Sequence, residues 1–544
     1  MEPEPKRQRP SPKIAVSKET TYVTAPLRED GYVDYIAAIN ERCSHGVTPK
    51  NNAAVPFWQA VGPKPLDMRI RERYFELLGI AELPEQGDYL LAFDEFVALQ
   101  NGSAQPDSDW PEAEGEAEGQ FDRAMKGPWS REEFPLVAAF LDRNSRPLQL
   151  LVNGLRRPRF YSPSVPTSAD RFADISLVTT GPPVRSIARQ LKVRAMLRLK
   201  DDDPIGAWQD VLAGYRLARL YAQGPFIVDR LIAFTLEGIA AFAATAASMH
   251  EGVTPAMARA CRIDLRGLPA VPSFRTVLDE GERLYQLNAA LDVALSGVRP
   301  LSKPNEMEQS AWELAESFDP DRKRREDAWS RLDSADVDWT EVFRQYNLWH
   351  DQMVAALDYA AWTERVREIT SLQEQAVTQV QQAIELILST EPSRLRDMSS
   401  RTKAQCVTRL LAGRGLGGSV NHSFVIFERR RQVYVDLVSL AFALAAYRHD
   451  HARYPKRLAQ LRPEYVDELP CDAFSGGDLH YEPKGDTYLL YSVGPNCRDD
   501  GGRNFWVDYW EDHERFDESL ESATAEEQAC DDIAIRTPPG RDGR

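Results

Sequence analysis

The sequence has little of what marks several large classes of protein. Its 544 residues include 6 cysteines and 8 histidines, and no C-x-x-C pair. Scattered cysteines exclude a disulfide scaffold and favour a reducing compartment. Acidic residues (83) outnumber Lys and Arg (66), and the net charge of −17 argues against a nucleic-acid partner. The motifs G-x-S-x-G, H-E-x-x-H and the P-loop are absent, so no catalytic or cofactor-binding residue is predicted.

Long hydrophobic runs are also scarce. The longest is Leu231 to Met249, in which the single charged residue is Glu237. A carboxyl group at the centre of a membrane span is costly, so this run predicts a buried helix of a helical domain. Attachment to the cell envelope through 231–249 is the alternative. The N-terminus has no apolar segment typical of a secretory signal, so we expect a cytoplasmic protein with a disordered arm over residues 1–20.

The negative charge is concentrated in two stretches. Residues 107–122 carry seven acids and no Lys or Arg, and residues 507–532 carry eleven acids and one Arg. Acidic runs without an apolar period are typical of solvated segments. We therefore predict an exposed acidic loop over 107–122 and an acidic, disordered tail over 509–544.

The spacing of apolar residues predicts a mainly α fold. From residue 21 to 412, apolar positions recur every three or four residues, which is typical of amphipathic helices. Three predicted helices, Arg185–Leu199, Ile205–Ala222 and Phe226–Met249, are separated by short polar or Gly-Pro breaks that favour antiparallel neighbours. We expect a large domain of packed helical hairpins, interrupted by a charged, linker-like segment over 300–336.

A glycine-rich segment follows at 413–419. Residues 413–418 match the pattern G-x-G-x-x-G, but a dinucleotide site needs a strand before the glycines, and the preceding residues favour a helix. The segment is therefore interpreted as a hinge.

The chain ends in a smaller α+β module, predicted over 420–508. One long helix covers residues 425–451 and includes a solvated basic turn at Arg429–Arg431. Two short aromatic and aliphatic runs, Leu479–Tyr481 and Tyr488–Tyr491, then indicate a short antiparallel sheet.

Three groups of residues in this module follow a recognisable order. They are Tyr447, Asp450, Tyr454 and Pro455; Pro470, Asp472 and Phe474; and Tyr491, Ser492, Gly494, Asn496, Asp499 and Asp500. In this order the module resembles the globular domain of type II secretion pseudopilins, the major pseudopilin especially. The whole chain is also similar to large bacterial proteins that join a helical region to such a module, a likeness that implies no activity.

The sequence departs from the pseudopilin pattern in ways that limit the inference. Ala452, Ala473 and Cys497 stand where that family usually has Gly, Pro and Gly. The family's apolar N-terminal membrane helix is replaced by Arg429–Arg431 and by about 400 residues of other protein. A secretion function therefore does not carry over.

The resemblance implies a calcium site in the loop that follows the sheet. Calcium prefers carboxylate, amide and hydroxyl oxygens, which Ser492, Asn496, Asp499 and Asp500 supply. If the acidic tail folds back, its acids would add to ion binding. The alternative is a polar loop whose Asp residues form turn hydrogen bonds.

The sequence leaves two main hypotheses for the function. The first is a non-catalytic scaffold or interaction protein with a pseudopilin-like head and a protein partner. The second is an enzyme with a site in a cleft of the helical domain, built from acids and histidines far apart in sequence. Converging polar groups around one pocket would favour the enzyme.

Overall fold

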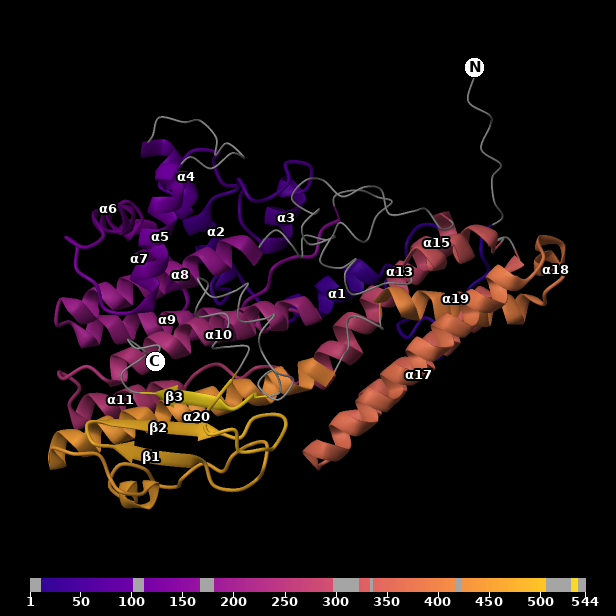
Figure 1. Cartoon of the computed structure of the whole chain (residues 1–544). Coiled ribbons are helices and arrows are strands. Elements are labelled where there is room, and N and C mark those ends of the chain that lie inside the picture. The colour runs from indigo at the N-terminus through magenta and orange to yellow at the C-terminus, as the bar shows by residue number, and fades with distance from the viewer. Residues whose placement is uncertain are drawn as a thin grey trace.

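A computed structural model describes the chain over residues 11–100, 112–166, 181–296, 322–332, 336–415, 422–504 and 530–536. The chain is mainly helical and carries a small three-stranded antiparallel sheet near the C-terminus, as the sequence predicts. Figure 1 shows the sheet along one side of the long helix α20, with the helical body on the other side. All six cysteines lie in the described part, and each has a free thiol.

Three N-terminal helices, Ala54–Val61, Arg71–Leu78 and Ser145–Gly154, pack around a core that is rich in aromatic side chains. Trp58 and Tyr74 are fully buried, and the Trp58 indole N–H donates to the Tyr74 hydroxyl at 3.0 Å. The helices of this part are α1 (Tyr35–Ser44), α2 (Ala54–Val61), α3 (Arg71–Leu78), α4 (Phe93–Gln100), α5 (Glu112–Lys126), α6 (Pro135–Arg143) and α7 (Ser145–Gly154).

Three long helices then stack as successive neighbours in the middle of the body (Figure 1). Asp203 begins the second of them by accepting a hydrogen bond from the Gly206 N–H at 2.8 Å, with Pro204 in the first turn. The helices are α8 (Gly181–Lys200), α9 (Pro204–Tyr221) and α10 (Ile227–Ser248), followed by α11 (Pro255–Arg266).

A second group of helices forms the far end of the body. The long helix α17 packs against α15, α16 and α19 of the same chain rather than standing alone. The group comprises α12 (Phe274–Thr276), the π-helix η2 (Val277–Glu282), α13 (Arg283–Ser296), α15 (Arg322–Arg331), α16 (Trp339–Ala356), α17 (Trp362–Ser389), α18 (Pro392–Arg396) and α19 (Ser400–Gly415).

The apolar run that could cross a membrane is helix α10. It is long and apolar enough to span a bilayer, but 61% of its apolar window is buried in the chain. Its Glu237 is paired with Arg219 of α9. This burial favours a core helix over attachment through 231–249.

The acidic loop predicted over 107–122 is wrong for residues 112–122, which belong to helix α5. Ala117, Phe121 and Ala124 recur at spacings of four and three, and all three are buried. The Phe121 ring packs against Phe93 of α4 at 4.8 Å. A short apolar face is therefore enough to fix the helix, although its opposite face is acidic.

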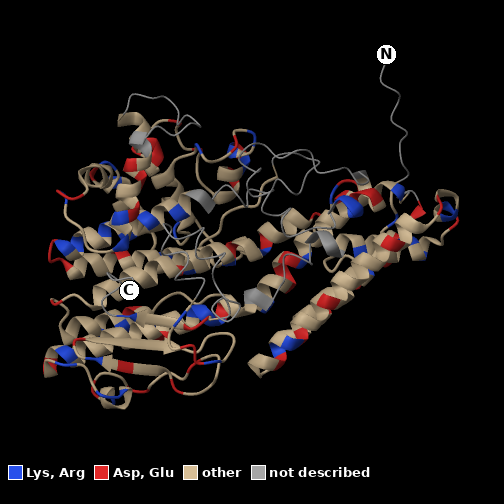
Figure 2. Cartoon of the chain, viewed as in Figure 1, with Lys and Arg blue, Asp and Glu red and all other residues tan. Residues whose placement is uncertain are grey.

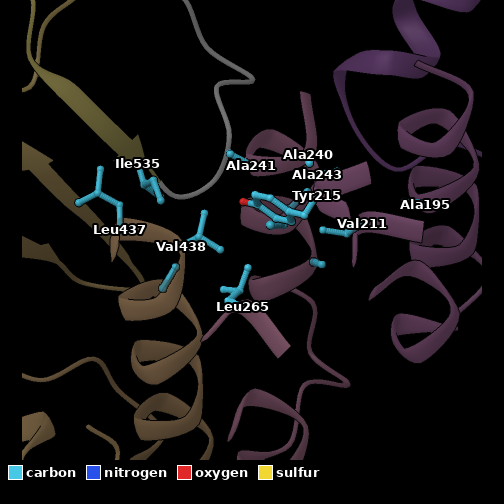
Figure 3. Close-up of a cluster of buried hydrophobic side chains, with 14 of the residues drawn as sticks. Ala195, Val211, Tyr215, Ala240, Ala241, Ala243, Leu265, Leu437, Val438 and Ile535 are labelled. Atoms are coloured by element: carbon cyan, nitrogen blue, oxygen red, sulfur yellow. The ribbon is translucent and has the colours of Figure 1, made fainter. Parts of the chain in front are cut away.

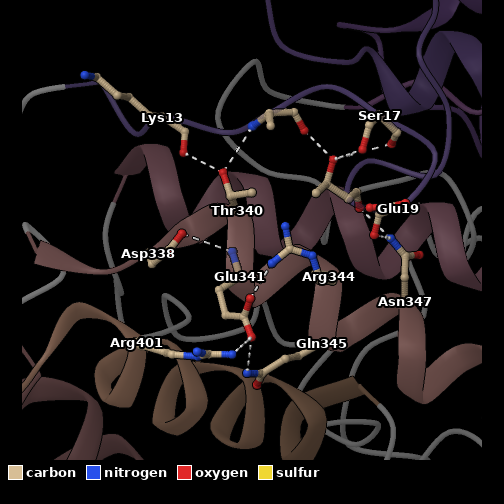
Figure 4. A network of polar contacts seen from close by, with 12 residues as sticks. Lys13, Ser17, Glu19, Asp338, Thr340, Glu341, Arg344, Gln345, Asn347 and Arg401 are labelled. Carbon is tan, nitrogen blue, oxygen red and sulfur yellow. Dashed lines mark hydrogen bonds and ion pairs between the residues drawn. The ribbon is translucent and has the colours of Figure 1, made fainter.

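The disordered arm predicted over residues 1–20 is wrong for residues 13–20. Thr340 of α16 accepts a hydrogen bond from the Ala15 N–H at 3.2 Å and donates to the Lys13 carbonyl at 3.3 Å (Figure 4). The side chain of Asn347 donates to the carbonyl of Thr20. Polar side chains of α16 thus bind the backbone of the arm and hold it on the body.

The linker over 300–336 and the hinge over 413–419 are each partly corrected. Residues 322–331 form α15, in which Ala328 and Trp329 are buried. Helix α19 continues to Gly415, so residues 413–415 are helical. The remaining residues of the hinge lie outside the described part, as do 300–321 and 333–335 of the linker.

The C-terminal part, which we call the head, comprises residues 422–504 and 530–536. Helix α20 (His422–His451) and the 3-10 turn η4 (Leu458–Leu461) precede the strands β1 (His480–Lys484), β2 (Thr487–Ser492) and β3 (Ile533–Arg536). The strand order is β1-β2-β3, and Leu490 of β2 lies opposite both Tyr481 and Ile535. The disordered tail predicted over 509–544 is therefore wrong for residues 533–536, which complete the sheet. Residues 509–529 and 537–544 lie outside the described part.

Helix α20 joins the head to the body. Figure 3 shows Leu437 and Val438 of α20 beside Leu265 of α11, with Ile535 of β3 and Tyr215 of α9 in the same cluster. The interdigitated apolar side chains make one continuous core of body and head.

The basic turn at Arg429–Arg431 is not solvated as predicted. Arg429 stacks on Trp362 of α17 at 4.7 Å and donates to the Ala473 carbonyl. Arg431 faces Glu237 of α10. The guanidinium groups of Arg429 and Arg431 thus meet an aromatic ring, a carbonyl and a carboxylate, which explains why this turn is half-buried.

Candidate metal centre

The predicted ligands Ser492 and Asp499 are held by partners of their own. Ser492 is fully buried, and its hydroxyl donates to Asp472 at 2.8 Å. Asp499 accepts hydrogen bonds from the Gly501 N–H at 3.0 Å and the Tyr491 hydroxyl at 2.9 Å. These bonds lower the pKa of Asp499 below its ordinary value.

The other two predicted ligands lie together in the loop after β2. The Asn496 side-chain N–H donates to Asp500 Oδ2 at 2.9 Å. The Asn496 backbone N–H donates to the carboxylate of Asp531, at 3.2 Å from the nearer oxygen. The loop therefore points toward the segment that leads into β3.

The structure adds two acids that the predicted set of ligands lacks. One carboxylate oxygen each from Asp500, Asp531 and Asp532 lie within 4.8 Å of one another. The pairing of β3 with β2 and the bridge between Asn504 and Asp531 bring the last two acids beside the loop. The sequence signal was the pair of acids directly before the alternating Ile533-Ala-Ile535, which has the period of a strand.

Asp532 has an unusual environment among these acids. It is fully buried, and its Oδ2 accepts hydrogen bonds from the Gly502 N–H at 2.8 Å and the Asp500 N–H at 3.0 Å. Its Oδ1 is buried and has no hydrogen-bond partner. Burial, with a contribution from the charge of Asp500, raises the pKa of Asp532 to about 6. A buried carboxylate oxygen without a partner is costly unless a cation or a proton meets it.

The surroundings of Asp531 also disfavour its negative charge. Burial raises the pKa of its carboxyl group, and the neighbouring Asp500 raises it further, whereas the Asn496 N–H and Arg430 act in the opposite direction. Three close carboxylates repel one another and so favour a bound cation.

The oxygen-only donor set fits a hard cation such as calcium. Calcium takes six to eight oxygens, and three carboxylates supply at most six. Backbone carbonyls and water would complete the shell. We call Asp500, Asp531 and Asp532 the acid cluster. It shares Asp500 with the set predicted from the sequence, and Asn496 lies beside it.

Buried polar groups also converge in the helical body, as the enzyme hypothesis expects. His350 Nε2 lies 2.9 Å from Gln286 Oε1, and the Gln286 side chain donates to Glu282 at 3.3 Å. Burial, together with the charge of Arg283, keeps the pKa of His350 well below its ordinary value. His350 is fully buried, so a substrate cannot reach its ring. The residue is therefore a neutral part of the core.

A second buried acid, Asp229, lies in the first turn of α10 and is within electrostatic reach of Glu282. It is buried in the first turn and accepts a hydrogen bond from the Phe226 N–H at 3.1 Å. Burial raises its pKa to about 7, partly offset by that N–H and by Arg230, while Glu282 adds to the rise. The folded chain thus binds this proton more tightly than the unfolded chain, so stability present at pH 4 is lost as the pH rises through 7.

Replacing Asp229 by Asn is therefore expected to reduce the loss of stability on going from pH 5 to pH 7.5. The advantage of the variant over the wild type should grow by about 2 kcal/mol across that range, because roughly 1.4 kcal/mol is lost per pH unit for each proton released. Urea unfolding at both pH values measures the difference. Asp94→Asn, an exposed change in the first turn of α4, is the control and should show no such trend.

Comparisons of the chain with protein-family models, with curated proteins and with solved structures give no match.

Proposed function

We propose that this protein is a non-catalytic scaffold or interaction protein whose head is held together by a bound calcium ion. The observation that carries the proposal is the buried, unpartnered Oδ1 of Asp532 in the acid cluster. Asp500 follows β2, whereas Asp531 and Asp532 precede β3. An ion held by all three would tie the end of the chain to the loop and stabilise the sheet.

The resemblance to pseudopilins supports this proposal. A long helix followed by a small antiparallel sheet and an acid-rich loop is the arrangement that the resemblance implies for the head. The helical body replaces the membrane helix of that family and gives α20 a packing surface on α10 and α11. We accordingly propose a protein as the partner and the cytoplasm as the location.

Calcium is expected to raise the melting temperature of the full chain. At a calcium concentration of about 100 times the Kd, the folded head gains about 2.7 kcal/mol. Scanning calorimetry in calcium, and in EDTA, measures this shift.

Two variants of the head make the experiment specific. Asp532→Asn should melt no lower than the wild type in EDTA, because it removes a buried charge and keeps an oxygen for the Gly502 N–H, but it should not respond to calcium. Asp499→Asn should respond like the wild type, because Asp499 is bound to Tyr491 and Gly501. A wild-type chain that melts at the same temperature in calcium and in EDTA would overturn the proposal.

A further inference from the structure

A group of buried and half-buried basic side chains lies where the body meets the head. Arg219 of α9, Arg230 of α10 and Arg431 of α20 surround Glu237, and Tyr215 of α9 lies one turn before Arg219. We call these five residues the arginine cluster. Figure 2 shows basic residues in the N-terminal half of α20, which packs against α10. In the described part of the chain, half of the buried side-chain polar atoms without a hydrogen-bond partner belong to this cluster. They are four donors, on Tyr215 and the three arginines, and the two carboxylate oxygens of Glu237.

The packing of α10 against α20 fixes the position of the cluster. The rings of Phe234 and Phe427 lie 4.9 Å apart and hold the two helices together. Arg230 and Glu237 lie one turn to either side of Phe234 on the same face of α10. Arg431 is one turn beyond Phe427, with its Nε 3.9 Å from Glu237 Oε2. The three guanidinium groups therefore approach from three different helices.

The cluster has more donors than acceptors. Arg219 forms an ion pair with Glu237, although without a well-directed hydrogen bond, and Arg230 donates one N–H to the Pro272 carbonyl. Arg230 Nε, Arg431 Nη1 and the Tyr215 hydroxyl are buried without a partner. A single carboxylate cannot satisfy three guanidinium groups, each with five N–H donors. Buried donors without acceptors are costly, so the excess calls for an acceptor-rich group.

Neighbouring acids do not fill this role. Asp436 is within electrostatic reach of Arg431 but accepts a hydrogen bond from Gln432 at 3.0 Å. Glu428 acts on Arg230 only through its charge. Burial, reinforced by the charge of Arg431, lowers the pKa of Arg230 to about 10 despite these acids. The acids around the cluster therefore balance its charge, but Arg230 Nε, Arg431 Nη1 and the Tyr215 hydroxyl still lack a hydrogen-bond acceptor.

We propose that the arginine cluster binds an oxyanion of the phosphate class, held by Arg219, Arg230, Arg431 and the Tyr215 hydroxyl. Guanidinium groups bind phosphate oxygens through paired N–H donors, and a hydroxyl supplies one more donor. The anion joins α9 and α10 of the body to α20 of the head. This site is separate from the acid cluster, whose ligand is a cation, so either proposal can fail without the other.

The test is a titration of the full chain with inorganic phosphate at constant ionic strength, followed by the melting temperature. The melting temperature of the wild type should rise with phosphate and reach a plateau by about 20 mM, a concentration range that detects a millimolar Kd. Tyr215→Phe removes only the unpartnered hydroxyl, so it should fold as well as the wild type and bind phosphate about tenfold more weakly. Glu237→Gln removes the competing carboxylate and should bind phosphate more tightly.

Tyr74→Phe is the matched control, because Tyr74 is equally buried but its hydroxyl is bonded to Trp58. Its phosphate response should equal that of the wild type. The proposal is overturned if phosphate has no effect beyond that of chloride at equal ionic strength, or if Tyr215→Phe responds like the wild type. It is also overturned if phosphate binds only after the acids of 511–527 are replaced by amides, because the chain itself then supplies the anion.

Discussion

Replacing Gly281 by Ala is expected to destabilise the helical body by about 3 kcal/mol, the upper part of the range for an inserted methyl group in a packed core. Gly281 belongs to the π-helix η2 and lies directly against the Gly224-Pro225 break before α10. A Cβ at this position would overlap the carbonyl oxygen and carbon of Pro225. These are backbone atoms, so relief requires moving α10 or η2 rather than turning a side chain.

Gly238→Ala in α10 is the matched control for this prediction. It has no atom within 4 Å of its added Cβ, so the change should be neutral or should stabilise the helix by up to about 1 kcal/mol. Denaturant unfolding followed by circular dichroism compares the two variants. Equal midpoints for Gly281→Ala and Gly238→Ala would show that the contact with Pro225 does not constrain the fold.

Replacing Gly494 by Ala is expected to detach β3 from the sheet and abolish the response of the head to calcium. Gly494 has a φ of 65°, and its added Cβ would overlap the backbone carbonyl of Asp531. The change therefore strains the loop and pushes away the segment that carries Asp531 and Asp532. We expect a loss of about 3 kcal/mol in the stability of the head.

Gly485→Ala is the control that separates backbone strain at a positive φ from the overlap with Asp531. Gly485 has a nearly equal φ of 63° in the turn between β1 and β2, but nothing lies within 4 Å of its added Cβ. It should cost only about 1 kcal/mol of backbone strain and retain the calcium response. Hydrogen exchange of Ile533 and Ile535 with and without calcium reports on β3. Protection of these amides in Gly494→Ala equal to that in Gly485→Ala would contradict the prediction.

Local patterns predicted most of the fold. The period of apolar residues identified the helical body, and the polar break before the predicted helix Ile205–Ala222 lies where α9 begins, at Pro204 with Asp203 as its N-cap. The pattern did not predict helix α5, because its first two turns alternate Glu with Ala and Gly. Too few apolar residues were present for the period to appear.

Local sequence patterns do not predict contacts between residues that are far apart in the chain. Residues 13–20 are fixed by Thr340 and Asn347, more than 320 residues away, and no local pattern records such a bond. Asp531 and Asp532 were counted only as part of an acidic stretch, because a strand that pairs across 40 residues is not specified by its own four residues. The sequence therefore identified only Asp500 of the acid cluster, together with the neighbouring Asn496, because the position of β3 was not predicted.

Isothermal titration of calcium into the full chain is the most direct test of the central claim, that the acid cluster binds calcium. The wild type is predicted to bind one calcium ion, and Asp532→Asn to bind it at least about 100-fold more weakly, because one of the three charged ligands is lost. No heat of binding to the wild type, or equal affinity for the wild type and Asp532→Asn, would contradict the account.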